Sequence, residues 1–195
     1  HIFFLTLVTS LILTSCQKLA IEPDTSDEDI STTSEGLNYW GGDYNDEGLA
    51  VIQTADGGYA VAGSQYSSSA QDELTLVKFS SKLEFEDKKN FGGGGADSSF
   101  SNTAKDIKQT KDGGYIMVGS TYNNTNGDFD VWIVKFAPDL TLTWEQAIAG
   151  ETAGSGAVTT GYDDFGSSIQ ELDNGNYLVC GTSYDVTNSD RDAML

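Results

Sequence analysis

The stretch that decides the fold is QTADGGYAVAGS, residues 53–64, which recurs with small changes as QTKDGGYIMVGS at residues 109–120 and as ELDNGNYLVCGT at residues 171–182. In each copy, strand-forming residues stand on both sides of a short run of Asp, Asn and Gly. Gly and Asn adopt the positive φ angles that a tight turn between antiparallel strands needs. Each copy therefore predicts a β-hairpin, and the three copies together predict a repeat architecture.

The repeat extends well beyond the hairpin. Tyr59, Tyr115 and Tyr177 are equivalent, with spacings of 56 (115 − 59) and 62 (177 − 115) residues. The first two units each contain four strand-like segments, and the third stops at Leu195, where Val-Lys-Phe is expected. Segments such as YIMVG and VWIVKF are apolar on both faces, so each sheet needs a similar sheet on either side. The fold class predicted is all-β, a β-propeller of four-stranded antiparallel blades.

The pattern Q-T-x-D-G-G-Y-x-V-x-G-S, followed by D-x-x-x-V-K-F, resembles the bacterial β-propeller repeat proteins of exported Bacteroidetes and archaeal chains. The resemblance covers about residues 40–195 and implies units at residues 37–93, 94–150 and 151–195. The segment LNYWGG, residues 37–42, is expected to be an outermost strand without a blade of its own. Two blades and part of a third do not close a ring of about four to eight blades, so a fragment of a propeller is expected.

The net charge excludes several classes of function. The formal charge is −20, and the only histidine is His1. Such a field repels phosphate backbones, so nucleic acid is not an expected partner. Catalytic sites that depend on histidine, and the usual zinc sites, are excluded from the body of the chain.

The first 36 residues indicate export. Residues 1–15 have the length and apolar character of a signal peptide. Leu13-Thr14-Ser15-Cys16 resembles a bacterial lipobox, which implies that Cys16 is lipidated and holds the chain on a membrane; an ordinary secretory signal with a chance cysteine is the alternative. Gln17 in place of Asp implies the outer membrane, with surface exposure as a further possibility. Residues 16–36 are acidic and predicted to be a flexible tether.

Two sets of side chains are candidate binding residues. Asp128 with Asp130, and Asp190 with Asp192, fall at equivalent positions before a third strand, with a spacing that Ca²⁺ can use; turn formation by Asp is the alternative. A repeated aromatic rim that could stack on sugar rings, or could instead pack between blades, is formed by Tyr66, Tyr122 and Tyr184.

No catalytic residue and no bound organic cofactor are predicted. Glu47, Glu145 and Glu171 stand in no distinctive context for acid or base chemistry, and Cys180 is predicted to be a buried small hydrophobe. The preferred hypothesis is a lipid-anchored binding or scaffolding module of the cell envelope, with a glycan or an envelope protein as ligand. The alternatives are a polysaccharide-active enzyme, glycoside hydrolase-like, with its active site largely outside these residues, and an adhesin-like spacer.

Overall fold

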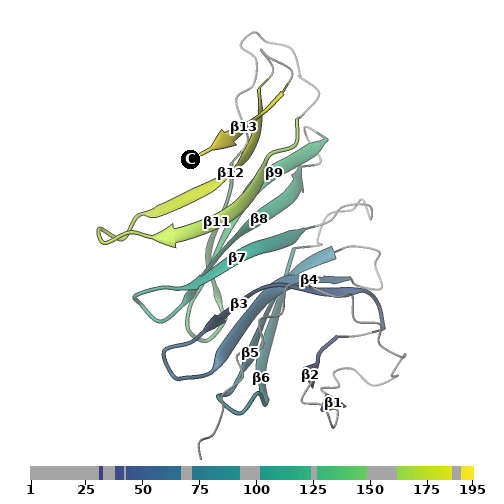
Figure 1. Cartoon of the computed structure of the whole chain (residues 1–195), viewed down its shortest axis with the longest axis vertical. Coiled ribbons are helices and arrows are strands. Elements are labelled where there is room, and N and C mark those ends of the chain that lie inside the picture. Colours follow the sequence, from purple (N-terminus) through teal and green to yellow (C-terminus); the bar gives the residue numbers. More distant parts are fainter. Residues whose placement is uncertain are drawn as a thin grey trace, which may run out of the picture.

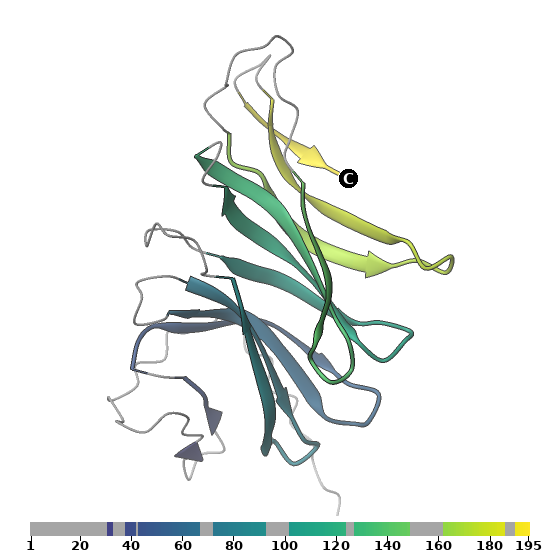
Figure 2. The same ribbon diagram turned by 180° about the vertical axis from the view of Figure 1, so that it is seen from behind.

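The computed structural model describes residues 31–32, 38–41, 43–66, 72–92, 102–123, 127–148, 162–185 and 190–195. These residues form strands and no helix. Three antiparallel sheets stack face to face along the long axis of the molecule (Figures 1 and 2). The all-β prediction and the repeated antiparallel sheets are confirmed. Each sheet is open, as the blades of a propeller are, but the three described sheets do not complete a ring of blades, so the propeller stays a prediction.

Each sheet is a meander in which strands adjacent in sequence pair with each other. Sheet 1 consists of β3 (Asp46–Gln53), β4 (Tyr59–Tyr66), β5 (Asp72–Phe79) and β6 (Phe85–Phe91). Sheet 2 consists of β7 (Thr103–Gln109), β8 (Tyr115–Asn123), β9 (Asp128–Phe136) and β10 (Leu142–Ile148). Sheet 3 consists of β11 (Phe165–Glu171), β12 (Tyr177–Asp185) and β13 (Asp190–Met194). A separate two-stranded sheet joins β1 (Ser31–Thr32) to β2 (Asn38–Tyr39).

The Thr-x-Asp-Gly-Gly motif is explained by the turn between the first two strands of a sheet. In sheet 1, the N–H of Thr54 donates to the carbonyl of Gly58 at 2.9 Å, and Gly57 has a φ of 86°. The Asp56 carboxylate accepts from the Thr54 hydroxyl and from the Gly58 N–H. Residues 110–114 repeat the same bonds in sheet 2. The aspartate therefore stabilises the turn locally, as Asx turns do.

The lysine of Val-Lys-Phe completes this turn in sheet 2. Lys135 is buried, and its Nζ donates to both carboxylate oxygens of Asp112, at 3.0 and 2.9 Å. The hydrogen bonds from the Thr110 hydroxyl, from Lys135 and from the Gly114 N–H lower the pKa of Asp112 to about 2. The third strand is thereby tied to the hairpin turn by a charge-assisted bond.

The glycine of the Val-Gly-Ser motif sits opposite a β-bulge. In sheet 2 the pairing of β7 with β8 shifts between Ala104 and Asp106, and Gly119 lies across from Ala104. A Cβ at Gly119 would lie 1.8 Å from the Thr103 carbonyl oxygen. The equivalent glycines of sheets 1 and 3 meet the same obstruction; they are Gly63 and Gly181. A glycine is therefore needed at this position of the motif, opposite a β-bulge that bends the first strand of each of the three sheets.

Sheet 2 is buried on both faces, as its doubly apolar strands predict. One core cluster joins sheet 1 to the face of sheet 2 that carries Met117 and Val134. A second cluster joins the face that carries Val118 and Ile133 to sheet 3. Alternation along β8 and β9 sends neighbouring side chains to opposite faces, so one sheet contributes to both cores.

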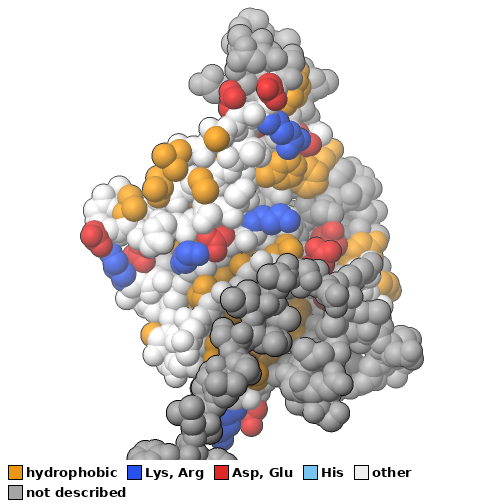
Figure 3. Space-filling model, viewed as in Figure 1, with side chains coloured by type: hydrophobic (Ala, Val, Ile, Leu, Met, Phe, Trp, Pro, Cys, Tyr) orange, Lys and Arg blue, Asp and Glu red, His pale blue; other side chains and the backbone are white. Residues whose placement is uncertain are grey.

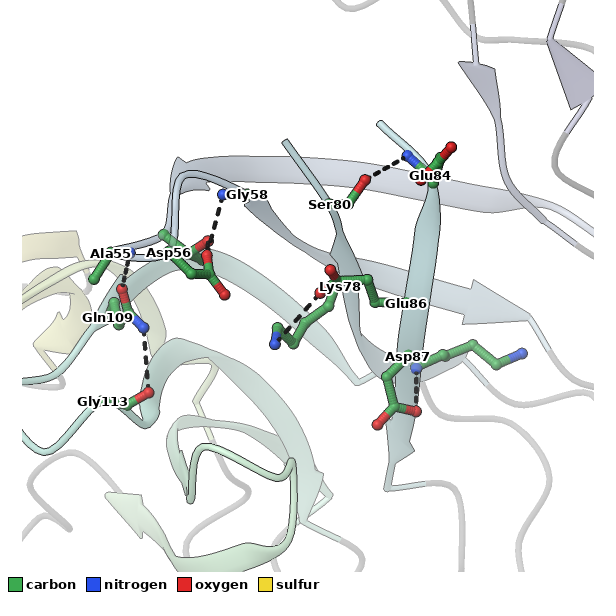
Figure 4. A network of polar contacts seen from close by, with 12 residues as sticks. Ala55, Asp56, Gly58, Lys78, Ser80, Glu84, Glu86, Asp87, Gln109 and Gly113 are labelled. Carbon is green, nitrogen blue, oxygen red and sulfur yellow. Dashed lines mark hydrogen bonds and ion pairs between the residues drawn. The ribbon is translucent and has the colours of Figure 1, made fainter. Parts of the chain in front are cut away.

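Side-chain hydrogen bonds join consecutive sheets at the turn end. Gln109 of sheet 2 accepts from the Ala55 N–H in the turn of sheet 1 at 2.7 Å and donates to the Gly113 carbonyl at 3.2 Å (Figure 4). At the equivalent position of sheet 3, the Glu171 carboxylate accepts from the Lys111 N–H in the turn of sheet 2 at 2.8 Å. The two interfaces therefore use the same bond between equivalent positions.

A backbone bond repeats in the same way at the other end of the first strands. The Asn102 N–H donates to the Asp72 carbonyl of sheet 1 at 3.0 Å, and the Asp164 N–H donates to the Phe129 carbonyl of sheet 2 at 2.6 Å. The first strands β3, β7 and β11 consequently lie side by side through the stack. Among the described strands, no comparable contact joins the fourth strands β6 and β10. The sheets therefore converge at their first strands.

The prediction that Cys180 is buried is wrong. Cys180 is a free and exposed thiol on β12. Its equivalent in sheet 2 is Val118, which is buried against sheet 3. The difference arises because no further sheet covers the outer face of sheet 3 among the described residues.

Candidate functional site

The predicted tyrosine rim lies at one end of the sheets, where the second strands finish. Tyr66 packs against Tyr44, with ring centroids 5.6 Å apart and tilted by 54°. Tyr184 stacks on Tyr162 at 4.2 Å with an angle of only 6°. Tyr44 and Tyr162 are 49% and 39% exposed, whereas Tyr66 and Tyr184 are partly buried. Each pair thus presents one exposed aromatic side chain supported by a second ring.

Tyr122 is held differently. Its ring meets Phe129 edge to face at 5.3 Å, and Phe129 in turn stacks on Phe165 of sheet 3 at 5.8 Å. The guanidinium of Arg191 lies 5.0 Å from the centroid of the Phe165 ring. Tyr122 therefore packs on a ring of its own sheet, and that ring in turn contacts sheet 3; a sugar-binding role of Tyr122 stays a prediction.

Sequence reasoning missed Tyr44 and Tyr162, although a signal was present. Each precedes the rim tyrosine of its own repeat by the same distance (66 − 44 and 184 − 162 both equal 22). The equivalent residue in the second repeat is also aromatic, Phe100, and lies outside the described residues. An alignment that included the segment before each first strand would have found these aromatic pairs.

The two predicted aspartate pairs have different environments. Asp128 and Asp130 are buried on β9, whereas Asp190 and Asp192 are exposed on β13. Burial is the largest cause that raises the pKa of Asp128, and the negative charge of Asp130 is the next. The four carboxylates therefore do not form a single group: one pair lies on β9 of sheet 2 and the other on β13 of sheet 3.

Sheet 3 contributes further acids near the buried pair. Asp163 accepts from the Phe129 N–H at 3.2 Å, and Asp164 accepts from the Tyr184 N–H at 3.1 Å. Both also raise the pKa of Asp128 through their charge. Within the described part of the chain, no group of three or more His, Cys, Asp or Glu side chains is arranged to hold a metal ion. A Ca²⁺ site stays a prediction.

Two of the glutamates considered as acids or bases have structural partners. Glu171 bonds the turn of sheet 2, as described above, and Glu145 accepts from the indole N–H of Trp132 at 2.9 Å. Glu47 is exposed on β3. Glu145 and Glu171 therefore each accept a hydrogen bond from a neighbouring strand or turn.

Lipidation falls outside the structure, because Cys16 is not among the described residues. The described residues contain no helix suited to span a bilayer. Neither a protein-family model nor a curated protein sequence matches the chain.

Proposed function

We propose that the chain is an exported, lipid-anchored binding module of the cell envelope, with a β-propeller arrangement of its sheets and a glycan as ligand. The exposed aromatic pairs carry this proposal. Tyr44–Tyr66 and Tyr162–Tyr184 occur at equivalent positions of sheets 1 and 3, at the same end of the strands. Aromatic rings offer a flat apolar face with a polar hydroxyl edge, which suits a sugar ring with its apolar face and hydroxyl rim.

Support for the propeller comes from the repeated interface. Gln109 accepts a hydrogen bond from the turn of sheet 1, and Glu171 accepts the equivalent bond from the turn of sheet 2. The backbone N–H groups of Asn102 and Asp164 likewise donate to equivalent carbonyls of the preceding sheet. Identical contacts imply nearly the same rotation from each sheet to the next. Close first strands and separated fourth strands are what wedge-shaped blades around an axis require.

Support for the envelope location comes from the sequence. The apolar leader, the lipobox-like Leu13–Cys16 and the acidic segment that follows would tether the sheets to an outer membrane. The expected outcome of metabolic labelling with palmitate is incorporation into the chain that is lost in Cys16→Ser. Unchanged incorporation in that variant would contradict the anchor.

Glycan binding is tested with a panel of soluble neutral polysaccharides and oligosaccharides, first on an array and then by calorimetry. The double variant Tyr44→Ala/Tyr162→Ala is expected to bind at least tenfold more weakly, because about 1.4 kcal/mol of stacking would be lost. Tyr59→Ala is the matched control, since Tyr59 lies at the opposite end of β4. Equal binding by the double variant, or no binding to any sugar of the panel, would refute the proposal.

A further inference from the structure

Three aspartates are buried where β9 begins, next to the segment that leads into β11. Asp128 is 6% exposed, Asp130 2% and Asp164 3%, and they are the only buried carboxylates among the described residues. The one buried base of those residues is Lys135, which bonds Asp112 toward the other end of β9. Buried charges in proteins are normally paired with an opposite charge or bound to a metal ion. The start of β9 therefore holds negative charge that Lys135 does not balance.

Phe129 connects these aspartates to one another. It lies between Asp128 and Asp130 on β9. Its N–H donates to the Asp163 carboxylate at 3.2 Å, and its carbonyl accepts from the Asp164 N–H at 2.6 Å. Two aspartates of β9 and two of the segment before β11 therefore lie next to the same residue. We name these four aspartates the acidic cluster.

One carboxylate oxygen of the acidic cluster is buried without a hydrogen bond. Asp128 Oδ1 is shielded from solvent, and no donor of the described residues reaches it. Burial raises the pKa of Asp128, and the negative charges of Asp130, Asp164 and Asp163 raise it further. Since Asp128 and Asp130 are two residues apart on a strand, both side chains leave β9 on the same face. A cation beside these two side chains would give Asp128 Oδ1 a partner.

Asp163, the exposed member of the acidic cluster, already has a cationic partner. Its carboxylate lies 3.6 Å from the guanidinium of Arg191, and the two side chains are 41% and 46% exposed. In Figure 3, acidic and basic side chains lie next to one another near the upper end of the molecule, at the end of sheet 3. Arg191 therefore balances Asp163 at the surface and not the buried Asp128.

We infer that the acidic cluster binds Ca²⁺, with Asp128 and Asp130 as its carboxylate ligands. Ca²⁺ accepts about six to eight oxygen ligands in variable geometry, including backbone carbonyls and water, whereas Mg²⁺ requires a near-ideal octahedron. That tolerance is needed because no three acidic side chains of the described residues are arranged as a ligand set. Water and backbone carbonyls complete the shell. Asp163 and Asp164 attract the cation through their charge, so the site also stabilises the contact between β9 and the segment before β11.

Thermal unfolding of the full chain tests this proposal, which does not depend on glycan binding. Protein stripped with EDTA is expected to melt about 3–10 °C higher after addition of about 10 mM CaCl₂, for a dissociation constant of about 0.1–1 mM. The same concentration of MgCl₂ is the control for general screening of the −20 net charge and is expected to give a much smaller shift.

Variants identify the ligands. Asp128→Asn/Asp130→Asn is expected to lose the Ca²⁺-dependent shift, and in EDTA it should melt no lower than the wild type because buried negative charge has been removed. Asp87→Asn/Asp139→Asn removes the same number of charges from exposed positions, so this matched control should keep the shift. Each single variant, Asp128→Asn or Asp130→Asn, is expected to bind Ca²⁺ about tenfold more weakly in calorimetry, which keeps the test open if the double variant does not fold.

Tb³⁺ luminescence gives a second readout that does not depend on stability. Tb³⁺ occupies Ca²⁺ sites and emits when a nearby indole is excited. Trp132 follows Asp130 by two residues and lies on the same face of β9. Emission is expected from the wild type and from the matched control, is expected to fall when Ca²⁺ displaces Tb³⁺, and is expected to be lost in Asp128→Asn.

The site is supported if the Ca²⁺ shift and the Tb³⁺ emission are lost only in variants of Asp128 and Asp130. Three results would overturn it: equal shifts with Ca²⁺ and Mg²⁺, a full Ca²⁺ shift in Asp128→Asn/Asp130→Asn, or no shift in the wild type. With no shift in the wild type, a proton and not a metal ion would neutralise Asp128.

Discussion

Replacement of Gly119 by alanine tests the origin of the Val-Gly-Ser motif. The new Cβ would lie 1.8 Å from the Thr103 carbonyl oxygen and 2.9 Å from the Ala104 Cα. A non-bonded carbon rests about 3.3 Å from an oxygen, so β7 and β8 would have to separate by about 1.5 Å at the bulge. The obstructing atoms belong to the backbone of Thr103 and Ala104, so rotation of a side chain cannot relieve the clash.

The expected cost follows from what that separation disrupts. About two ladder hydrogen bonds beside the bulge would be lost, at about 1 kcal/mol each. Displacement of the packed neighbours Met117 and Val118 adds about 2 kcal/mol. Gly119→Ala is therefore expected to lower the free energy of unfolding by about 4 kcal/mol, a large share of the stability of a typical domain. The melting temperature should fall by about 10 °C.

The measurement is far-UV circular dichroism during thermal and urea unfolding, with Gly113→Ala as the matched control in the same hairpin. Gly113 has a φ of 82°, and its nearest obstacle is Pro138 Cγ at 3.6 Å, so alanine there costs only about 1–2 kcal/mol of conformational strain. If Gly119→Ala destabilises no more than Gly113→Ala, the steric explanation of the motif is refuted.

Three further predictions concern charge and burial. Because the folded pKa of Asp112 is lowered to about 2, its stabilising effect is full above about pH 4 and is lost as the pH falls toward 2; Lys135→Met should flatten this part of an acid-unfolding curve. The effect should be about 1 kcal/mol, because the carboxylate is 64% exposed. Asp128→Asn is expected to raise the melting temperature at pH 7, since burial and nearby carboxylates raise the pKa of Asp128 and its ionisation therefore disfavours folding; a lower melting temperature would contradict this. Ile107→Ala should lower the free energy of urea unfolding by about 2–5 kcal/mol, whereas Val51→Ala, at the same repeat position but exposed, should change it by less than about 0.5 kcal/mol. Equal losses would show that burial does not distinguish the two positions.

Local features of the fold were predictable from the sequence because their causes lie within a few residues. The Asp-Gly-Gly turns follow from the φ angles that glycine allows, and Gly57 and Gly113 indeed have positive φ. The doubly apolar strands of residues 115–118 and 131–136 required cover on both sides, and sheet 2 has it. The candidate site was only partly predictable. Tyr66 and Tyr184 could be named from the repeat, but their stacking partners lie in segments without strand character.

What the sequence alone determined is the hairpin, its repetition and the apolar character of each strand face. Tertiary structure decided which equivalent residues are buried: Asp128 is buried and Asp190 exposed, and Val118 is buried while Cys180 is exposed. The physical reason is that burial is conferred by the neighbouring sheet and not by the residue itself. Equivalent residues of repeats with similar sequences therefore differ in exposure and in side-chain pKa according to the place of their sheet in the stack.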